Sequence, residues 1–124
     1  MAYSLVHKFF TMLPDSKISR LLAHQITGLA DVMEQHNGRG KVSKVIHSFA
    51  DYTRQMIRLG RMAEVKHCFT MAAVLYHNGS ALLKNAIESV YIYTLSPVLQ
   101  RPAKDLLPAT LRRIRTHHLQ TAGI

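Results

Sequence analysis

Residues 42–60 have the sequence VSKVIHSFADYTRQMIRLG, and the pattern in this stretch decides the fold class. Its apolar residues recur every three or four positions, so at about 100° per residue they gather on one side of a helix. They are Val42, Val45, Ile46, Phe49, Tyr52, Met56 and Leu59. Gly60 suits the C′ position, where a helix commonly ends in a left-handed conformation. We therefore predict an amphipathic helix from about Val42 to Leu59.

Glycine and proline signals divide the rest of the chain into further helical segments. We expect them over 3–12, from 15 or 16 to the Asn-Gly-Arg-Gly turn at 37–40, over 62–77, from Ser80 to Gln100, and over 107–119. The predicted fold is all-α, an irregular bundle of about six helices. Glycine breaks recur about every 20 residues, so HEAT-like antiparallel helix pairs are an alternative description.

The segment from Ser80 to Gln100 is apolar around much of its circumference, which is typical of a helix packed between others. Its stretch Val90–Thr94 also has strand propensity, so a strand is the alternative there. Glu88 lies in the middle of this segment. We expect its carboxylate either to pair with Lys84, one helical turn earlier, or to lie in a functional cleft.

The 124 residues fit a single domain, 1–124, with a short N-terminal helix within 1–14 and a frayed tail at 120–124. The first residues lack the apolar run of a signal peptide, and the most apolar stretch, Ser89–Leu99, is too short to span a bilayer. The lone cysteine, Cys68, cannot form an intrachain disulfide. We expect a soluble, cytoplasmic protein without membrane insertion.

The chain is strongly basic, because 16 Lys and Arg residues against 7 Asp and Glu residues give a formal net charge of +9. The cations form two groups. The first is a stripe along the predicted helix at 42–59 that continues just past its end. The second lies near the C-terminus, beside His117 and His118. The groups are Lys44, Arg54, Arg58 and Arg61, and then Arg112, Arg113 and Arg115. Such a balance favours an anionic partner.

An acidic protein is a better candidate partner than a nucleic acid. A nucleic-acid interface is expected to interleave aromatic residues with its cations. Here the aromatics follow the apolar stripes instead and are expected in the core: Phe49, Phe69, Tyr76 and Tyr91. The basic residues are therefore predicted to form a partner-binding face.

The sequence predicts no metal, cofactor or catalytic site. Glu64 and His67 have the Glu-x-x-His spacing of di-iron bundles, but such a site needs two of these motifs and further carboxylates. Cys68 lies within an apolar stripe, where a structural role is expected. An enzyme that uses Glu88 and a nearby histidine is the least favoured alternative, since these groups would have to meet in a concave pocket.

From about Val45 onward, several features resemble an uncharacterised family of short bacterial helical domains, found mostly in Bacteroidetes, that carries a domain-of-unknown-function label. The matching features are Phe49-Ala50-Asp51-Tyr52, Gly60, Phe69, Asn78-Gly79, Lys84-Asn85-Ala86-Ile87 and Leu107-Pro108-Ala109-Thr110-Leu111-Arg112. The resemblance covers about residues 45–118 and implies no activity. Its members tend to have an acid near the end of the fifth helix, where this chain has Tyr93.

These observations favour a non-catalytic protein–protein interaction domain that binds an acidic partner through its basic face. By analogy with other small bacterial helical proteins, an immunity-type protein is one form of this hypothesis. A nucleic-acid-binding protein that uses the Arg- and Lys-rich helix faces is the alternative. A homodimer is left open.

Overall fold

The computed structural model describes residues 13–35 and 41–121 and confirms an all-α bundle. The predicted helix at 3–12, the turn at 37–40 and residues 122–124 of the tail lie outside the described residues. The helices are α2 (Ile18–Gln25), α3 (Ala30–Glu34), α4 (Val42–Arg58), α5 (Met62–Asn78), α6 (Ala81–Ala86), α7 (Ile92–Leu95) and α8 (Ala109–Thr121). A π-helical segment, Ile87–Tyr91, joins α6 to α7. Short 3-10 turns occupy Asp15–Lys17, Thr27–Leu29, Ser96–Val98 and Ala103–Leu106.

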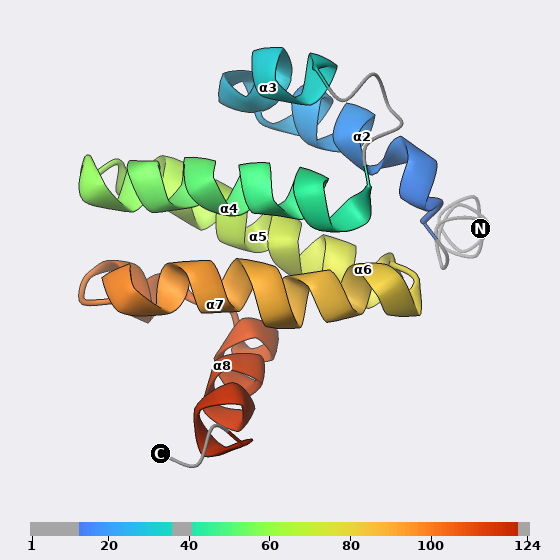
Figure 1. The fold of residues 1–124 in the computed structure, drawn as a ribbon. Helices are drawn as coiled ribbons and strands as arrows, with labels where there is room; N and C mark the ends of the chain where they lie inside the picture. The colour runs from blue at the N-terminus through green and yellow to red at the C-terminus, as the bar shows by residue number, and fades with distance from the viewer. Residues whose placement is uncertain (1–12, 36–40, 122–124) are drawn as a thin grey trace, which may run out of the picture.

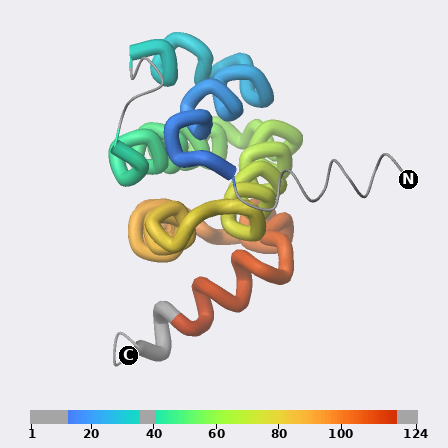
Figure 2. The backbone as a smooth tube through the Cα atoms, turned by 90° about the vertical axis from the view of Figure 1, so that its right-hand side faces the viewer, coloured from blue at the N-terminus to red at the C-terminus, as the bar shows by residue number. Residues whose placement is uncertain are grey.

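Helix α4 lies at the centre of the bundle (Figure 1). The α2–α3 pair covers it on one side, and α5 and the α6–α7 segment cover it on the other. Successive long helices alternate in direction, as expected of antiparallel pairs. Helix α8 contacts α5, α7 and the π segment, and Figure 2 shows it running away from the stacked helices.

The turn after α4 has the form that the sequence predicts. Gly60 has a φ of 72°, its N–H donates to the carbonyl of Ile57, and the N–H of Arg61 donates to that of Met56. These two bonds form a Schellman motif, which satisfies carbonyls at the end of the helix. Gly60 is suited to this position because residues with a Cβ rarely adopt a positive φ.

The prediction of one continuous helix from 15 or 16 to 36 is wrong. The helix stops at Gln25, because Ile26 has an extended backbone, and resumes through the 3-10 turn at Thr27–Leu29. The Thr-Gly pair within that turn has low helix propensity. The break brings Gly28 against the ring of Tyr52, where a Cβ would overlap the tyrosine. Tertiary contact with α4 therefore accompanies the interruption.

The segment from Ser80 to Gln100 is helical through most of its length, so the strand alternative at Val90–Thr94 is wrong. The Ser80 hydroxyl caps α6 by accepting from the N–H of Leu83, 3.1 Å away, and donates to Asp15. Four-residue spacing places five buried residues along this segment: Leu83, Ile87, Tyr91, Leu95 and Leu99. Burial supplies the driving force that outweighs local strand propensity.

The last helix begins two residues later than predicted, at Ala109, because Pro108 precedes it and its carbonyl accepts from the N–H of Arg112. The helix extends to Thr121, beyond the predicted end at Leu119. Within the described residues, no helix is long and apolar enough to cross a membrane.

A buried polar pair lies inside the core. Thr53 donates its single hydroxyl proton to the carbonyl of Phe49, so the Tyr91 hydroxyl, 3.0 Å away, must donate to Thr53. The rings of Phe49 and Tyr91 pack against each other at a tilt of 34°, with centroids 4.8 Å apart. Phe49, Phe69 and Tyr91 are buried, which confirms their assignment to the core.

Candidate functional site

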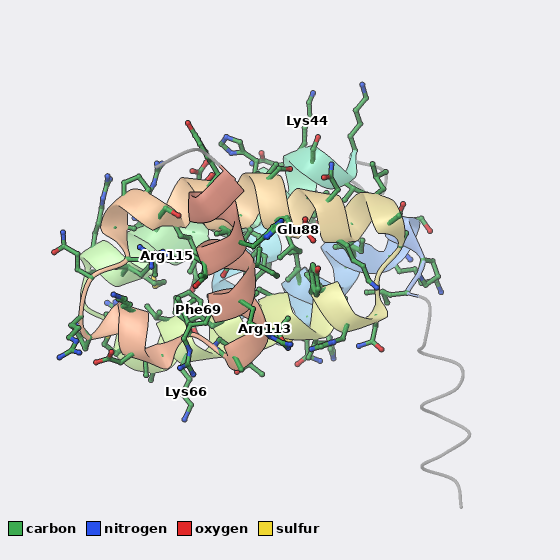
Figure 3. The ribbon with its side chains drawn as sticks, turned by 90° about the horizontal axis from the view of Figure 1, so that it is seen from below. Lys44, Lys66, Phe69, Glu88, Arg113 and Arg115 are labelled. Carbon is green, nitrogen blue, oxygen red and sulfur yellow. The ribbon has the colours of Figure 1, made fainter. Side chains whose placement is uncertain are left out.

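The basic residues of α4 occupy different surroundings. Lys44 is exposed beside His47 and Val90, whereas Arg54 is held by Asp51, with 2.9 Å between guanidinium and carboxylate. Arg58 is exposed in the last turn, and Arg61 lies beside a hollow at the α4–α5 turn. In Figure 3, Lys44 projects from the molecule well away from Arg113 and Arg115.

The three arginines of α8 also have separate environments. Arg112 is exposed, and its Nε donates to the carbonyl of Leu107 over 3.2 Å. Arg115 is half-buried, with an enclosed Nε that has no hydrogen-bond partner. Arg113 lines a groove between α8 and the bundle. The seven predicted cations thus lie in several environments, and only Arg113 among them lines this groove.

The groove has a volume of about 540 Å³. One side comes from the end of α5, from α6 and from the π segment, and is lined by Tyr76, His77, Asn85, Glu88 and Ser89. The other side is one face of α8, lined by Thr110, Arg113, Ile114 and His117. His77 lies in the last turn of α5, and its Nε2 joins the Thr110 hydroxyl over 2.9 Å, which ties α5 to α8.

Glu88 is half-buried in the π segment, and its partner is a hydroxyl rather than the predicted ammonium. The Tyr76 hydroxyl donates to Glu88 Oε2 over 2.7 Å. Lys84 lies instead over the Tyr76 ring, with Nζ 5.8 Å from the centroid. An ammonium at this distance from an aromatic face is attracted by the ring quadrupole. The ion pair between Glu88 and Lys84 is therefore a wrong prediction.

The neighbours of Tyr76 shift its pKa in opposite directions. The hydrogen bond to Glu88 raises the pKa of Tyr76, burial and the charge of Glu88 raise it further, and the nearby charge of Arg113 lowers it. Tyr76 is half-buried, packs against the core and also lines the groove, so its assignment to the core is confirmed only in part. No local signal in the sequence identifies this contact, because Tyr76 and Glu88 lie twelve residues apart on either side of the Asn78-Gly79 turn and meet only when the two helices pack.

A second tyrosine–glutamate pair has the same twelve-residue spacing. The Tyr52 hydroxyl on α4 donates to Glu64 in the first turn of α5. Burial, the largest cause, and the hydrogen bond to Glu64 raise the pKa of Tyr52. The pair lines a hollow of about 880 Å³ at the α4–α5 turn.

The Glu-x-x-His motif is explained by this second pair. Glu64 accepts from Tyr52, and His67 Nε2 lies 2.8 Å from the carbonyl oxygen of Gln25. Because a carbonyl only accepts, Nε2 carries the proton in this contact. Over the described residues, no group of three or more His, Cys, Asp or Glu could hold a metal ion. The two side chains thus connect α5 to α4 and to the end of α2.

Residues 19–121 match a protein family described as a domain of unknown function (DUF7674). The chain belongs to this family. The match confirms the resemblance to a family of unknown function and extends it toward the N-terminus, through α2 and α3. No curated protein and no solved structure matches the chain.

In this member of DUF7674, Cys68 is buried in α5, as its place in the apolar stripe predicts. Burial raises the pKa of its thiol to about 12, so the thiol stays protonated near neutral pH. The groove, by contrast, brings together Glu88, His77, His117 and Arg113. It therefore contains the glutamate and histidines that the catalytic alternative requires, together with a cation from the predicted basic face.

Proposed function

We propose that this protein is a non-catalytic protein-binding domain whose α8 surface and groove bind an acidic partner. The observation that supports it best is the state of Arg113, which faces the groove without an ion-pair partner among the described residues. Helix α8 contains three arginines and no acidic residue, and it stands out from the bundle (Figures 1 and 2). An unpaired cation on a projecting helix favours electrostatic association with an acidic surface.

A protein partner suits this arrangement better than a nucleic acid. Binding to the phosphate backbone gains from many cations along one surface. Here Arg54 is neutralised by Asp51, Lys44 lies apart from α8, and the groove itself contains Glu88. These features weaken the attraction for a continuous row of phosphates.

Capture experiments test the proposal. The native chain, immobilised and incubated with nuclease-treated extract of its source cells, should retain an acidic protein in stoichiometric amount. The double variant Arg112→Glu/Arg113→Glu should lose it, whereas Arg20→Glu/Lys66→Glu, which reverses two exposed cations on α2 and α5, serves as the charge-matched control. Capture that occurs only from a parallel extract without nuclease, and that falls steeply as salt rises, would instead support the nucleic-acid alternative. If no protein is retained, the proposal is wrong.

Narrower versions of the proposal depend on the partner. An immunity-type role in a bacterial cytoplasm is supported if the captured protein is toxic alone and neutralised by this chain. The mass of the free chain in solution decides whether it forms a homodimer.

Catalysis is the second candidate, because Glu88 and two histidines share one groove. It predicts that the captured partner changes in mass during incubation and that Glu88→Gln abolishes the change. An unchanged partner mass excludes this reaction on the partner.

A further inference from the structure

The groove contains one acidic and one basic side chain that do not neutralise each other. Glu88 belongs to the π segment and Arg113 to α8, and both line the same cavity (Figure 3). They form no ion pair. Between elements of one chain, such opposed groups can each bind part of a ligand that carries complementary groups.

Each side of the groove offers a defined interaction. The Arg113 guanidinium has forked N–H donors, which match the two oxygens of a carboxylate. Glu88 accepts from Tyr76 through Oε2, which leaves Oε1 to accept another hydrogen bond. The Asn85 side-chain amide lines the same cavity and can donate or accept.

These groups disfavour a ligand that can only accept or only donate hydrogen bonds. A simple anion would be attracted by Arg113 but repelled by Glu88. A simple cation would be attracted by Glu88 but repelled by Arg113. A ligand that has a carboxylate next to an N–H donor satisfies both. The volume of about 540 Å³ lies within the range of about 300–1,000 Å³ that is usual for ligand pockets.

We propose that the groove binds an acidic peptide segment of the partner, with an Asp or Glu carboxylate paired to Arg113 and an adjacent backbone N–H donating to Glu88. This inference rests on the proposed function, because it assigns the acidic partner to one site. It also gives Glu88 a role in discrimination: the carboxylate repels phosphate more strongly than a single carboxylate group, because phosphate carries the larger negative charge.

Small probes test the site directly. The full chain, labelled with ¹⁵N, is titrated with N-acetyl-glutamate N-methylamide, with the corresponding glutamine derivative, with acetate and with inorganic phosphate. The glutamate probe should shift the amide signals of 85–89 and 110–114. It should bind at least about tenfold more tightly than the glutamine probe, because a hydrogen bond to a charged group is lost in the latter.

Variants then assign the two interactions. Arg113→Ala should lower the affinity for the glutamate probe by about tenfold or more. Arg113→Lys should have an intermediate affinity, because lysine keeps the charge but lacks the forked N–H donors of the guanidinium. Arg20→Ala, an exposed site on α2 outside the groove, is the control and should leave the affinity unchanged. Glu88→Gln should reduce the preference for the glutamate probe over acetate without weakening acetate. Circular dichroism checks that each variant is folded.

Three results would overturn the inference: equal binding of the glutamate and glutamine probes, Arg113→Ala affinity within twofold of native, or phosphate binding as tight as the glutamate probe. Binding of the probe outside the groove would do the same. Partner capture that survives Arg113→Ala but fails in the double variant would overturn this site alone, whereas failure of the native chain to capture any protein would overturn the proposed function.

Discussion

The two tyrosine–glutamate pairs use the same bond in different ways. At the α4–α5 turn, Tyr52 and Glu64 connect two helices, Gly28 of the preceding turn contacts the Tyr52 ring, and the neighbouring His67 binds the carbonyl of Gln25. In the groove, Tyr76 and Glu88 make the same contact, yet Arg113 faces them without forming an ion pair. The first pair fastens three elements together. The second pair leaves polar groups available to a ligand.

The two tyrosines also differ in the main cause of their raised pKa values. Burial is the largest cause for Tyr52, whereas the bond to Glu88 is the largest for Tyr76. Both bonds are partly buried, and the one in which burial has the larger effect should cost more to remove, because water replaces the lost partner less readily there. The pair at the α4–α5 turn should therefore contribute more to stability, and the groove pair more to binding.

The largest expected effect comes from Gly28→Ala. Its Cβ would overlap the Tyr52 ring, so we expect a loss of about 2 kcal/mol in the free energy of unfolding, as in other overpacked sites. Urea denaturation measures it. The same substitution in a Tyr52→Ala background should cost less than half as much, since the overlapping ring is gone. Equal costs in both backgrounds would show that the ring is not the obstacle.

Replacing each tyrosine by phenylalanine compares the two hydrogen bonds. Tyr52→Phe should lower the free energy of unfolding by about 1 kcal/mol, and Tyr76→Phe by less than half of that. Urea denaturation of both variants at pH 7 gives the comparison. A larger cost for Tyr76→Phe would reverse the assignment of the two pairs.

The smallest expected effect is seen at high pH. The native state holds the pKa of both tyrosines above the ordinary value of 10.0. Unfolded tyrosines therefore ionise first as the pH rises, so the stabilisation is complete below pH 10 and is lost above it. Because both hydrogen bonds are only partly buried, solvent screens them, and the change is expected to be a few tenths of a kcal/mol between pH 10 and 11.

Denaturation of native protein and of both variants over that interval measures the alkaline loss. Tyr52→Phe should flatten the decline more than Tyr76→Phe, because the pKa of Tyr52 is raised further than the pKa of Tyr76. Tyr91 and Cys68, whose pKa values are also raised, remain in every variant and contribute a common background. Identical slopes in all three proteins would rule out a contribution from either pair.

Local features of the fold could be predicted from the sequence. The apolar stripe of α4, the positive φ of Gly60 and the Ser80 cap depend on neighbours within one or two turns. The break near Gly28 and the position of Tyr76 could not be predicted, because each depends on contact with another helix.

The candidate site was predicted only in part. Glu88 and Arg113 were both singled out, but for different roles and in separate groups. A charge count along the chain does not show which cations face the same cavity. The groove exists because α8 packs across α5 and the π segment, and no spacing within α8 specifies that docking.

The four-residue spacing of the five buried residues from Leu83 to Leu99 indicates how this helical segment is wound. In an α-helix, positions four apart drift by about 40° around the axis, so four such steps would carry the stripe almost to the opposite side. The π segment lies in the middle of this stripe, and its wider turn takes up part of the drift. A strict period of four is thus a readable sign of an underwound helix. Deleting one residue from Ile87–Tyr91 would tighten that turn and rotate all later side chains by about 100° relative to α6.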